Sequence, residues 1–389
     1  MHTGRTVFAQ LMDVVPRRAF ETSVQRFQGN RRVRSFSCYD QFLCMAFAQL
    51  TYRESLRDIE TCLRALQPKL YHAGLRGRVS RSTLADANEA RDWCLYADFA
   101  HALIRRARQL YLNEPFGVQL AQTAYAFDAT TIDLCLALFP WARFRRHKAA
   151  VKLHTLLDLR ANIPTFVAIT EGATADVTLL DALVVEPGAF YVLDRGYTDF
   201  GRLYVVTQGL AFFVIRGKRG LDYARRVSRP VDQTTGLRSD QTIVLCGPKT
   251  AHLYPDPLRR ITYVDAETAT RFVFLTNNFA LPALQIAQLY KYRWQVELFF
   301  KWIKQHLRIK AFYGTSVNAV KTQIWIAISV YVLVAILKKT LHLERSLSEI
   351  LQILSVTLFE RMPIPQVVTV FAAQDEMSDS RNQLPLFDL

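Results

Sequence analysis

Residues 124–138, AYAFDATTIDLCLAL, begin the stretch that decides the fold of this chain. Two further apolar runs follow closely, AVKLHTLLDLR at 150–160 and IPTFVAIT at 163–170. Each run contains β-branched or aromatic residues and is bounded by polar ones, which is typical of β-strands. The sequence therefore predicts three consecutive strands here.

Helices alternate with strands in the next part of the chain. Apolar runs at 189–197 and 211–217 each follow a segment with helical spacing, at 177–185 and 200–208 respectively. A three-stranded meander followed by alternating helices and strands indicates a mixed α/β sheet that helices cover. Beyond Gly217, turn-rich sequence separates short apolar runs, which predicts a β-rich insertion. Its expected strands are 242–246, 261–265 and 271–276.

The two ends of the chain show the periodicity of helices. Apolar residues recur at i, i+3 and i+4 in N-terminal segments and in late ones. These segments are 8–15, 38–50, 53–66, 82–111, 281–307 and 316–341. A basic segment without any acid, QRFQGNRRVRSFS at 25–37, separates the first two. It is either a phosphate-facing arm or a solvated loop that happens to be basic.

The net charge of the chain indicates which class of molecule it binds. The 389 residues carry 49 Lys and Arg against 34 Asp and Glu, a net charge of +15. Half of the residues are hydrophobic and only 21% are charged, which excludes a mainly disordered chain. Such a positive field favours a polyanionic partner, either nucleic acid or an anionic membrane surface.

The longest apolar run argues against a membrane partner. Residues 324–337 are 14 uncharged residues, whereas a helix needs about 20 to span a bilayer, so we expect a buried core helix. The N-terminus lacks the apolar core and cleavage site of a signal peptide, which predicts a cytoplasmic protein. The six cysteines include no Cys-x-x-Cys pair, so we expect reduced thiols rather than a zinc site.

Glu297 lies among cations in a predicted late helix. If 281–307 forms one helix, four polar residues fall within an arc of about 60°. They are Tyr290, Arg293, Glu297 and Lys304. The apolar stripe beside them would pack into a core. Taken alone, this pattern is also typical of an ordinary ion-pair network on a solvated helix.

Two aspartates occupy strand positions that suit a ligand site. Asp194 ends an apolar run and so lies at the carboxyl end of a predicted strand, where α/β sheets bind their ligands. Asp128 lies within the first predicted strand, where an unpaired buried carboxylate is costly and a metal would remove the cost. The alternative is that each Asp caps a turn, or that Thr130 and Thr131 satisfy Asp128.

Three motifs together resemble the DDE transposases of the bacterial insertion-sequence-four group. They are FDATTID at 127–133, YVLDRGY at 191–197 and YKYRWQVELFFKWIK at 290–304. The last fits that group's Y-(2)-R-(3)-E-(6)-K signature. The resemblance spans about residues 120–340, and the N-terminal part is similar to a small helical domain commonly fused ahead of this core.

The resemblance implies an α/β fold, with an RNase H-like mixed sheet flanked by helices, a β-rich insertion and an N-terminal all-helical domain. It implies that Asp128, Asp194 and Glu297 are catalytic acids and metal ligands. The chain would then divide into five parts. These are 1–120, a helical and DNA-binding region; 121–219, the first part of the catalytic core; 220–275, the insertion; 276–345, the C-terminal part of the core with the Glu-bearing helix; and 346–389, a C-terminal helix and tail.

The implied chemistry is metal-dependent phosphodiester cleavage and joining. Three carboxylates without nearby His or Cys are hard ligands that suit Mg²⁺ or Mn²⁺. Two such ions can activate a water or a DNA 3′-hydroxyl and stabilise the leaving oxygen. The expected enzyme is a cut-and-paste DDE transposase that acts on insertion-sequence ends and transfers them into target DNA. We expect terminal inverted repeats and target DNA as partners, a homodimer in the synaptic complex and a nucleoid-associated location.

Basic and aromatic side chains are expected to contact the DNA. Tyr290, Arg293 and Lys304 of the signature would bind phosphates around the scissile bond, Arg293 through a bidentate fork. Further cations, mostly in acid-poor segments, could extend this contact, although solubility charge is the alternative for any one of them. They are Arg31, Arg32, Arg34, Arg145, Arg146, Lys148, Arg195 and Arg216.

Two other functions would use the same residues. A non-catalytic DNA-binding remnant, or an inhibitor of transposition, needs only the positive charge, and the intact acids Asp128, Asp194 and Glu297 argue against it. A nuclease on the same fold would cut DNA without joining strands. Inverted repeats and a short target duplication in the flanking DNA would distinguish a transposase from both.

Overall fold

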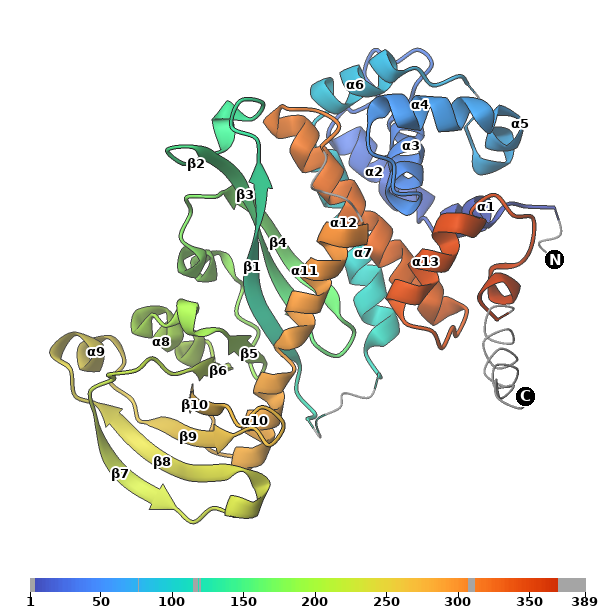
Figure 1. The fold of residues 1–389 in the computed structure, drawn as a ribbon. Coiled ribbons are helices and arrows are strands. Elements are labelled where there is room, and N and C mark those ends of the chain that lie inside the picture. Colours follow the sequence, from blue (N-terminus) through green and yellow to red (C-terminus); the bar gives the residue numbers. More distant parts are fainter. Residues whose placement is uncertain (1–3, 76, 115–117, 119, 307–311, 370–389) are drawn as a thin grey trace, which may run out of the picture. The chain divides into compact units, whose positions relative to one another are not determined.

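The structure is a computed structural model that describes residues 4–75, 77–114, 118, 120–306 and 312–369. Its residues divide into two compact units (Figure 1). The sheet unit is Tyr111–Lys301, and the helical unit combines Met1–Leu110 with Trp302–Leu389. The segment 276–345, expected as one part of the core, is therefore divided between the units. Each unit is described by itself.

A ten-stranded mixed sheet forms the centre of the sheet unit. Its strands are β1 (Ala124–Leu134), β2 (Arg143–Arg145), β3 (Lys148–Asp158), β4 (Ile163–Glu171), β5 (Phe190–Leu193), β6 (Phe212–Arg216), β7 (Tyr223–Arg229), β8 (Leu237–Leu245), β9 (Leu258–Val264) and β10 (Arg271–Thr276). The order is β2-β3-β1-β5-β6-β10-β9-β8-β7, and β4 pairs with β3.

The pairing confirms the expected mixed α/β fold. Strands β1, β3 and β4 form an antiparallel meander, as the three consecutive apolar runs predict. Strands β5 and β6 run parallel to β1, since intervening segments return the chain across the sheet. These segments are the 3₁₀ helix η3 (Asp176–Ala182), where an α-helix was expected, the short η4 (Arg195–Tyr197) and helix α8 (Phe200–Gln208). The prediction of 200–208 as helical is confirmed.

The β-rich stretch after Gly217 continues the same sheet, because β10 pairs antiparallel with β6. The strands expected at 242–246, 261–265 and 271–276 correspond to β8, β9 and β10. Strand β7 was not predicted because its sequence, YARRVSR, is largely polar, and its four central residues are exposed at the sheet edge. The short helix α9 (Pro248–Leu253) was also missed.

Helices pack on opposite faces of this sheet. Phe127 on β1, Leu193 on β5 and Leu275 on β10 are buried in one apolar core with Leu203 of α8. The neighbouring residue on β10, Phe274, points to the other face and packs its ring 4.7 Å from that of Tyr290. Burying one such side chain stabilises the folded state by about 1.5–3 kcal/mol. Apolar packing on both faces therefore fixes the sheet, and with it the strand ends that carry polar groups.

The predicted helix 281–307 is two helices. Helix α10 (Ala283–Lys291) ends before Arg293, and α11 (Trp294–His306) begins after it. At the junction the amide of Arg293 donates to the carbonyl of Tyr290, and that of Val296 donates to the carbonyl of Arg293, both i→i−3 bonds typical of a tightened turn. The single arc calculated for the four signature residues is therefore wrong, since it assumed an unbroken helix.

The helical unit consists of α1 (Val7–Asp13), α2 (Arg17–Arg26), α3 (Cys38–Leu50), α4 (Leu56–Ala65), α5 (Gln67–Leu70), η1 (Tyr71–Ala73), α6 (Arg81–Ala90), α7 (Cys94–Tyr111), α12 (Val317–Thr340), α13 (Leu347–Thr357) and the end of α11. The helix expected at 38–50 is confirmed as α3, whose Ser37 and Asp40 form a capping box. The segment 82–111 is broken into α6 and α7, and α2 was not predicted.

Helix α12 is long and apolar enough to cross a membrane by composition, but 94% of its most apolar window is buried inside the structure. Residues 324–337 within it are all buried. This confirms the expectation of a core helix.

Candidate active site

Asp128 and Asp194 lie on adjacent parallel strands at matching positions. The strand register pairs Phe127 of β1 with Leu193 of β5, and the residues that follow them in the sequence are Asp128 and Asp194. Asp194 is also the residue that precedes η4, at the carboxyl end of β5. Parallel pairing thus brings together two acids that are 66 positions apart, as Asp128 and Asp194 are numbered.

A single guanidinium connects two of the acids. Arg293 donates from Nη1 to Oδ2 of Asp128 at 2.9 Å, and from Nη2 to Oε1 of Glu297 at 2.6 Å. The side chains of Arg293 and Asp128 are 16% and 20% exposed, and that of Glu297 is 43% exposed. The buried carboxylate expected on the first strand therefore has an ion-pair partner, rather than the hydroxyls of Thr130 or Thr131.

Glu297 owes its place to the start of α11. It lies in the first turn of that helix, where a carboxylate interacts favourably with the amino-terminal dipole. Arg293 precedes Glu297 by four residues and lies just outside α11. The tightened turn at the α10–α11 junction therefore sets the direction of both side chains. The ion pair expected on the helix surface exists, but it is directed at Asp128.

Burial has the largest effect on the pKa of Asp128. Removal from water is the main cause that raises the pKa of Asp128 to about 6, and the nearby charges of Asp194 and Glu297 contribute to the same rise. The amide of Ala129, which donates to Asp128 Oδ1 at 2.8 Å, and the guanidinium of Arg293 oppose that rise. Burial and the neighbouring acids thus disfavour a negative charge on Asp128, and such a perturbed carboxyl group is typical of functional sites.

Tyr290 reaches the same centre from α10. Its hydroxyl donates to Oδ1 of Asp194 over 3.4 Å, and burial raises its pKa to about 12, so it remains a neutral donor. Arg216, at the end of β6, lies over the ring of Phe272 at 5.0 Å, and its charge acts on Tyr290. Three of the four signature residues and Arg216 are thus gathered around two strand ends.

The donor set suits a hard cation. Among the described residues, no group of three or more His, Cys, Asp or Glu side chains is close enough to form a ready metal cluster. Instead Arg293 bridges Asp128 and Glu297, and its charge stands where a cation would balance the carboxylates. Carboxylate oxygens are the ligands that Mg²⁺ and Mn²⁺ prefer, so the chemistry of these residues fits such an ion.

Tyr197 is a residue of this centre that sequence reasoning missed. It belongs to the DRGY motif, in which the sequence predicts only Asp194 and Arg195 as site residues. Its side chain is buried against Phe127, with ring centroids 5.2 Å apart. Its buried hydroxyl has no hydrogen-bond partner among the described residues, and the charges of Asp128 and Asp194 act on it.

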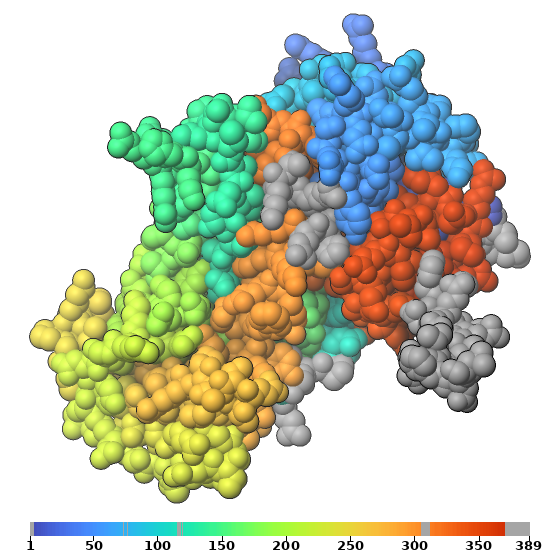
Figure 2. All heavy atoms as spheres, in the orientation of Figure 1, coloured from blue at the N-terminus to red at the C-terminus, as the bar shows by residue number. Residues whose placement is uncertain are grey.

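The other residues predicted to contact DNA are distributed over both units. Arg145, Arg146 and Lys148 are exposed on the hairpin between β2 and β3, which projects from its unit (Figures 1 and 2). Arg195 is exposed beside Asp194, and Arg216 is half-buried. Lys304 lies on α11, about 20° around the helix from Glu297, and belongs to the helical unit.

Four other residues that the sequence singles out are exposed. Arg31, Arg32 and Arg34 are all exposed in the helical unit, in the loop between α2 and α3. Asp133, the other carboxylate on the first strand, is also exposed and forms no ion pair with another described residue. Of the two aspartates of β1, only Asp128 therefore belongs to the polar centre.

Comparison with known proteins places these features in a family. Residues 120–333 match the family described as Transposase DDE domain, and residues 3–76 match a domain of unknown function, DUF4372. The chain is 32% identical over 292 residues to a protein of Sinorhizobium fredii named as the transposase y4zB, which covers 73% of this chain and 79% of that protein.

Two more similarities are less extensive. A protein of Geobacillus stearothermophilus named as the transposase for insertion sequence element IS5377 is 31% identical over 206 residues, 53% of this chain and 54% of that protein. The solved structure of a piggyBac transposase synaptic complex with hairpin DNA aligns with a TM-score of 0.44 and 11% identity. That alignment covers 97% of this chain and 86% of the other.

Proposed function

The chain belongs to the Transposase DDE domain family and functions in DNA transposition, and we propose that Asp128, Asp194 and Glu297 are its catalytic carboxylates. The observation that carries the proposal is the convergence of three distant segments on one polar centre. Asp128 lies on β1, Asp194 directly follows the adjacent parallel strand β5, and Arg293 connects Asp128 to Glu297.

The three carboxylates would hold divalent cations, and we propose two ions of Mg²⁺ or Mn²⁺. When bound, such ions make a water or a 3′-hydroxyl nucleophilic and stabilise the charge on the leaving oxygen. Asp128 is suited to this task because its burial penalises an uncompensated negative charge. The chain itself contributes the carboxylates, the surrounding donors and the exclusion of water on the core side.

Arg293 would change partner during this process. In the structure its two Nη atoms contact Asp128 and Glu297, while its buried Nε has no hydrogen-bond partner among the described residues. A guanidinium released from the acids can grip a phosphate through two parallel hydrogen bonds. Tyr290 and Arg216, which flank it, would add a hydroxyl donor and a second positive charge near the scissile phosphate.

DNA is the proposed substrate of both units. Insertion-sequence ends and target DNA would follow the cations at Arg145, Arg146, Lys148 and Arg195, with Lys304 binding a further phosphate. On the helical unit, Arg31, Arg32 and Arg34 would bind DNA. We propose a homodimer in the synaptic complex and a cytoplasmic, nucleoid-associated enzyme, in keeping with the net charge of +15.

The domain division follows from these roles. We propose that 1–120 is a DNA-binding region, that 121–219 and 276–345 supply the catalytic core, and that 220–275 is an insertion. The segment 346–389 would add a C-terminal helix, and the tail predicted beyond residue 369 lies outside the described residues. Support comes from the family match over 120–333 and from the position of Asp194 and Glu297 on either side of the β-rich stretch.

The decisive experiment is cleavage of a DNA fragment that carries the element's own ends, with and without Mg²⁺. Asp194→Asn should abolish cutting while it preserves binding of the ends. The matched control is Asp133→Asn, an exposed aspartate on β1, which should cut at the wild-type rate. Full activity of Asp194→Asn would refute the assignment. Formation of joined strand-transfer products separates a transposase from a nuclease, and binding without any cutting by the wild type indicates a non-catalytic remnant.

A further inference from the structure

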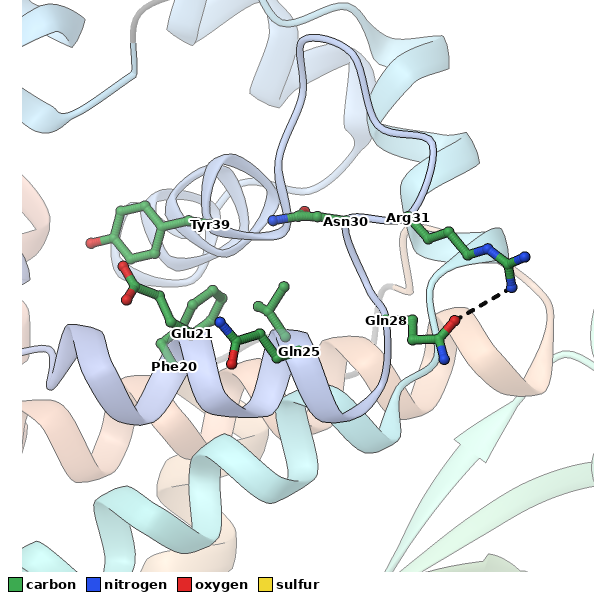
Figure 3. A pocket seen from close by; sticks show the side chains of 8 residues that line it. Phe20, Glu21, Gln25, Gln28, Asn30, Arg31 and Tyr39 are labelled. Carbon is green, nitrogen blue, oxygen red and sulfur yellow. Dashed lines mark hydrogen bonds between the residues drawn. The ribbon is translucent and has the colours of Figure 1, made fainter.

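A groove in the helical unit lies outside the proposed catalytic centre. It runs between α2 and α3, beside the loop of residues 27–36, and has a volume of about 480 Å³ (Figure 3). Phe20 and Tyr39 form its apolar part, and the side chains along its length are largely uncharged amides. These are Gln25, Gln28 and Asn30, followed by the guanidinium of Arg31. The groove falls in the segment that matches a domain of unknown function.

The loop beside the groove has an unusual backbone and a closely packed glycine. Gln28 and Arg32 adopt left-handed backbone angles, with φ of 50° and 60°, which cost free energy in residues other than glycine. Between them Gly29 is packed so closely that a Cβ atom there would lie 2.4 Å from Leu95. Such a strained and closely packed loop presents its side chains without a large ordering cost on binding.

Hydrogen bonds inside the loop use the side-chain oxygens of Asn30 and Gln28 and leave their amide donors available. The Oδ1 of Asn30 accepts from the amide of Cys38 at 2.8 Å, so its Nδ2 remains to donate. The Oε1 of Gln28 accepts from Arg31 at 3.4 Å, as the dashed line in Figure 3 shows, and its Nε2 likewise remains. Gln25 is exposed on α2. The groove thus offers exposed amide and guanidinium groups.

This set of groups suits bases better than phosphates. Neutral amides gain little from a phosphate charge, whereas Asn and Gln pair with the N6 and N7 edge of adenine and Arg with the O6 and N7 edge of guanine. The groove also contains one acid, Glu21, which disfavours a phosphate but can accept from the amino group of cytosine. Arg32 and Arg34 do not line this groove and are exposed nearby, where they can hold the backbone.

The aromatic residues do not provide a stacking platform for a single strand. The ring of Tyr39 is covered by the guanidinium of Arg17, whose Cζ lies 3.4 Å from the ring centroid. Phe20 is 2% exposed and packs edge-on against Phe99, with ring centroids 4.9 Å apart. Binding of single strands depends on free aromatic faces. The groove is therefore better suited to the base edges of duplex DNA.

We propose that the α2 helix and the 27–36 loop recognise a base sequence in duplex DNA, with Gln25, Gln28, Asn30 and Arg31 contacting base edges and Arg34 a phosphate. This inference rests on the proposed function as a transposase that binds DNA ends. It assigns the selection of sequence to the helical unit and leaves cutting to the carboxylates of the sheet unit.

The test uses the full chain and two pools of random DNA, one duplex and one single-stranded. Bound molecules are recovered and sequenced, and salt dependence of binding is measured on the enriched duplex. Gln25→Ala is tolerated by an exposed helical position, and Gln28→Gly suits the left-handed backbone. Thr22→Ala, on α2 outside the groove, is the matched control, and Arg34→Ala is the phosphate variant.

Wild type and Thr22→Ala should enrich the same motif from the duplex pool. Gln25→Ala and Gln28→Gly should lose the preference at one or two positions, each by about 5- to 100-fold, with an unchanged salt slope. Arg34→Ala should keep the motif while its slope falls by about 0.9.

An unchanged motif in both amide variants overturns the proposal, as does enrichment from the single-stranded pool only, or duplex binding without any preferred sequence. Absence of all DNA binding overturns the proposed function as well. The two failures are therefore distinguishable.

Discussion

Arg293 and Asp128 form an ion pair 2.9 Å long across 165 positions of the chain. The pair joins the junction of two helices to the first strand of the sheet. It is mostly removed from solvent, and the same guanidinium also binds Glu297. Because Asp194 directly follows the adjacent strand β5, three acids lie close together and two of them bind Arg293, which is the physical basis of the predictions below.

Glu297→Gln should separate DNA binding from catalysis. The amide keeps the size of the side chain and can still accept from Arg293, but it removes one unit of ligand charge. Mg²⁺-dependent cleavage of end-containing DNA should fall by about 10²- to 10³-fold or more, because metal-assisted stabilisation is worth several kcal/mol. Affinity for the ends, measured by a gel shift in the absence of metal, should be unchanged. Glu171→Gln, an exposed position at the end of β4, is the control, and wild-type cleavage by Glu297→Gln would contradict the assignment.

Arg293→Ala should make the folded protein depend on divalent cations. Loss of the guanidinium leaves Asp128 largely buried without its partner, which should lower the free energy of unfolding by about 2–3 kcal/mol. Added Mg²⁺ should restore more stability to the variant than it adds to the wild type, since it would supply the missing charge. Denaturant titrations of both proteins, with Mg²⁺ and with a chelator, measure the difference. Equal effects of Mg²⁺ on the two would count against a cation site at these acids.

Asp128→Asn should stabilise the metal-free protein at neutral pH. The folded pKa of Asp128 is about 6 and its ordinary value is 3.8, so between these values the folded state binds more protons than the unfolded one. Stability therefore falls as the pH rises from about 4 to about 6, by about 2–3 kcal/mol in all from this group. The neutral variant should gain that amount at pH 8 and nothing near pH 4. Thermal unfolding of both proteins across this range tests it, and a pH-independent difference would show that burial of charge is not the cause.

Lys304→Ala should reduce the salt dependence of DNA binding. If Lys304 binds one phosphate, the slope of log affinity against log salt becomes shallower by about 0.9. Lys301→Ala is the control because Lys301 is exposed on the same helix but is not part of the signature. Binding curves at four or more salt concentrations give both slopes. An unchanged slope in Lys304→Ala would assign the residue a structural role.

Local sequence patterns predicted a large part of the fold. Alternating apolar runs predicted β3 and β4, and helical periodicity predicted α3 and α8, because these elements bury one face and their residues suit that geometry. Strand β7 escaped prediction since an edge strand buries little, so its composition is not constrained by a core. The break between α10 and α11 was invisible because the segment around Tyr292 and Arg293 contains neither Pro nor Gly.

By itself the sequence determined the identity of the acids, the spacing of the Y-R-E-K signature and the excess of positive charge. The tertiary structure alone decided which groups meet. Parallel pairing of β1 with β5 makes Asp128 a neighbour of Asp194, and the tightened turn before α11 directs Arg293 at Asp128 as well as Glu297. The reason is that strand register and helix breaks are settled by contacts between distant segments, which no window of local sequence contains.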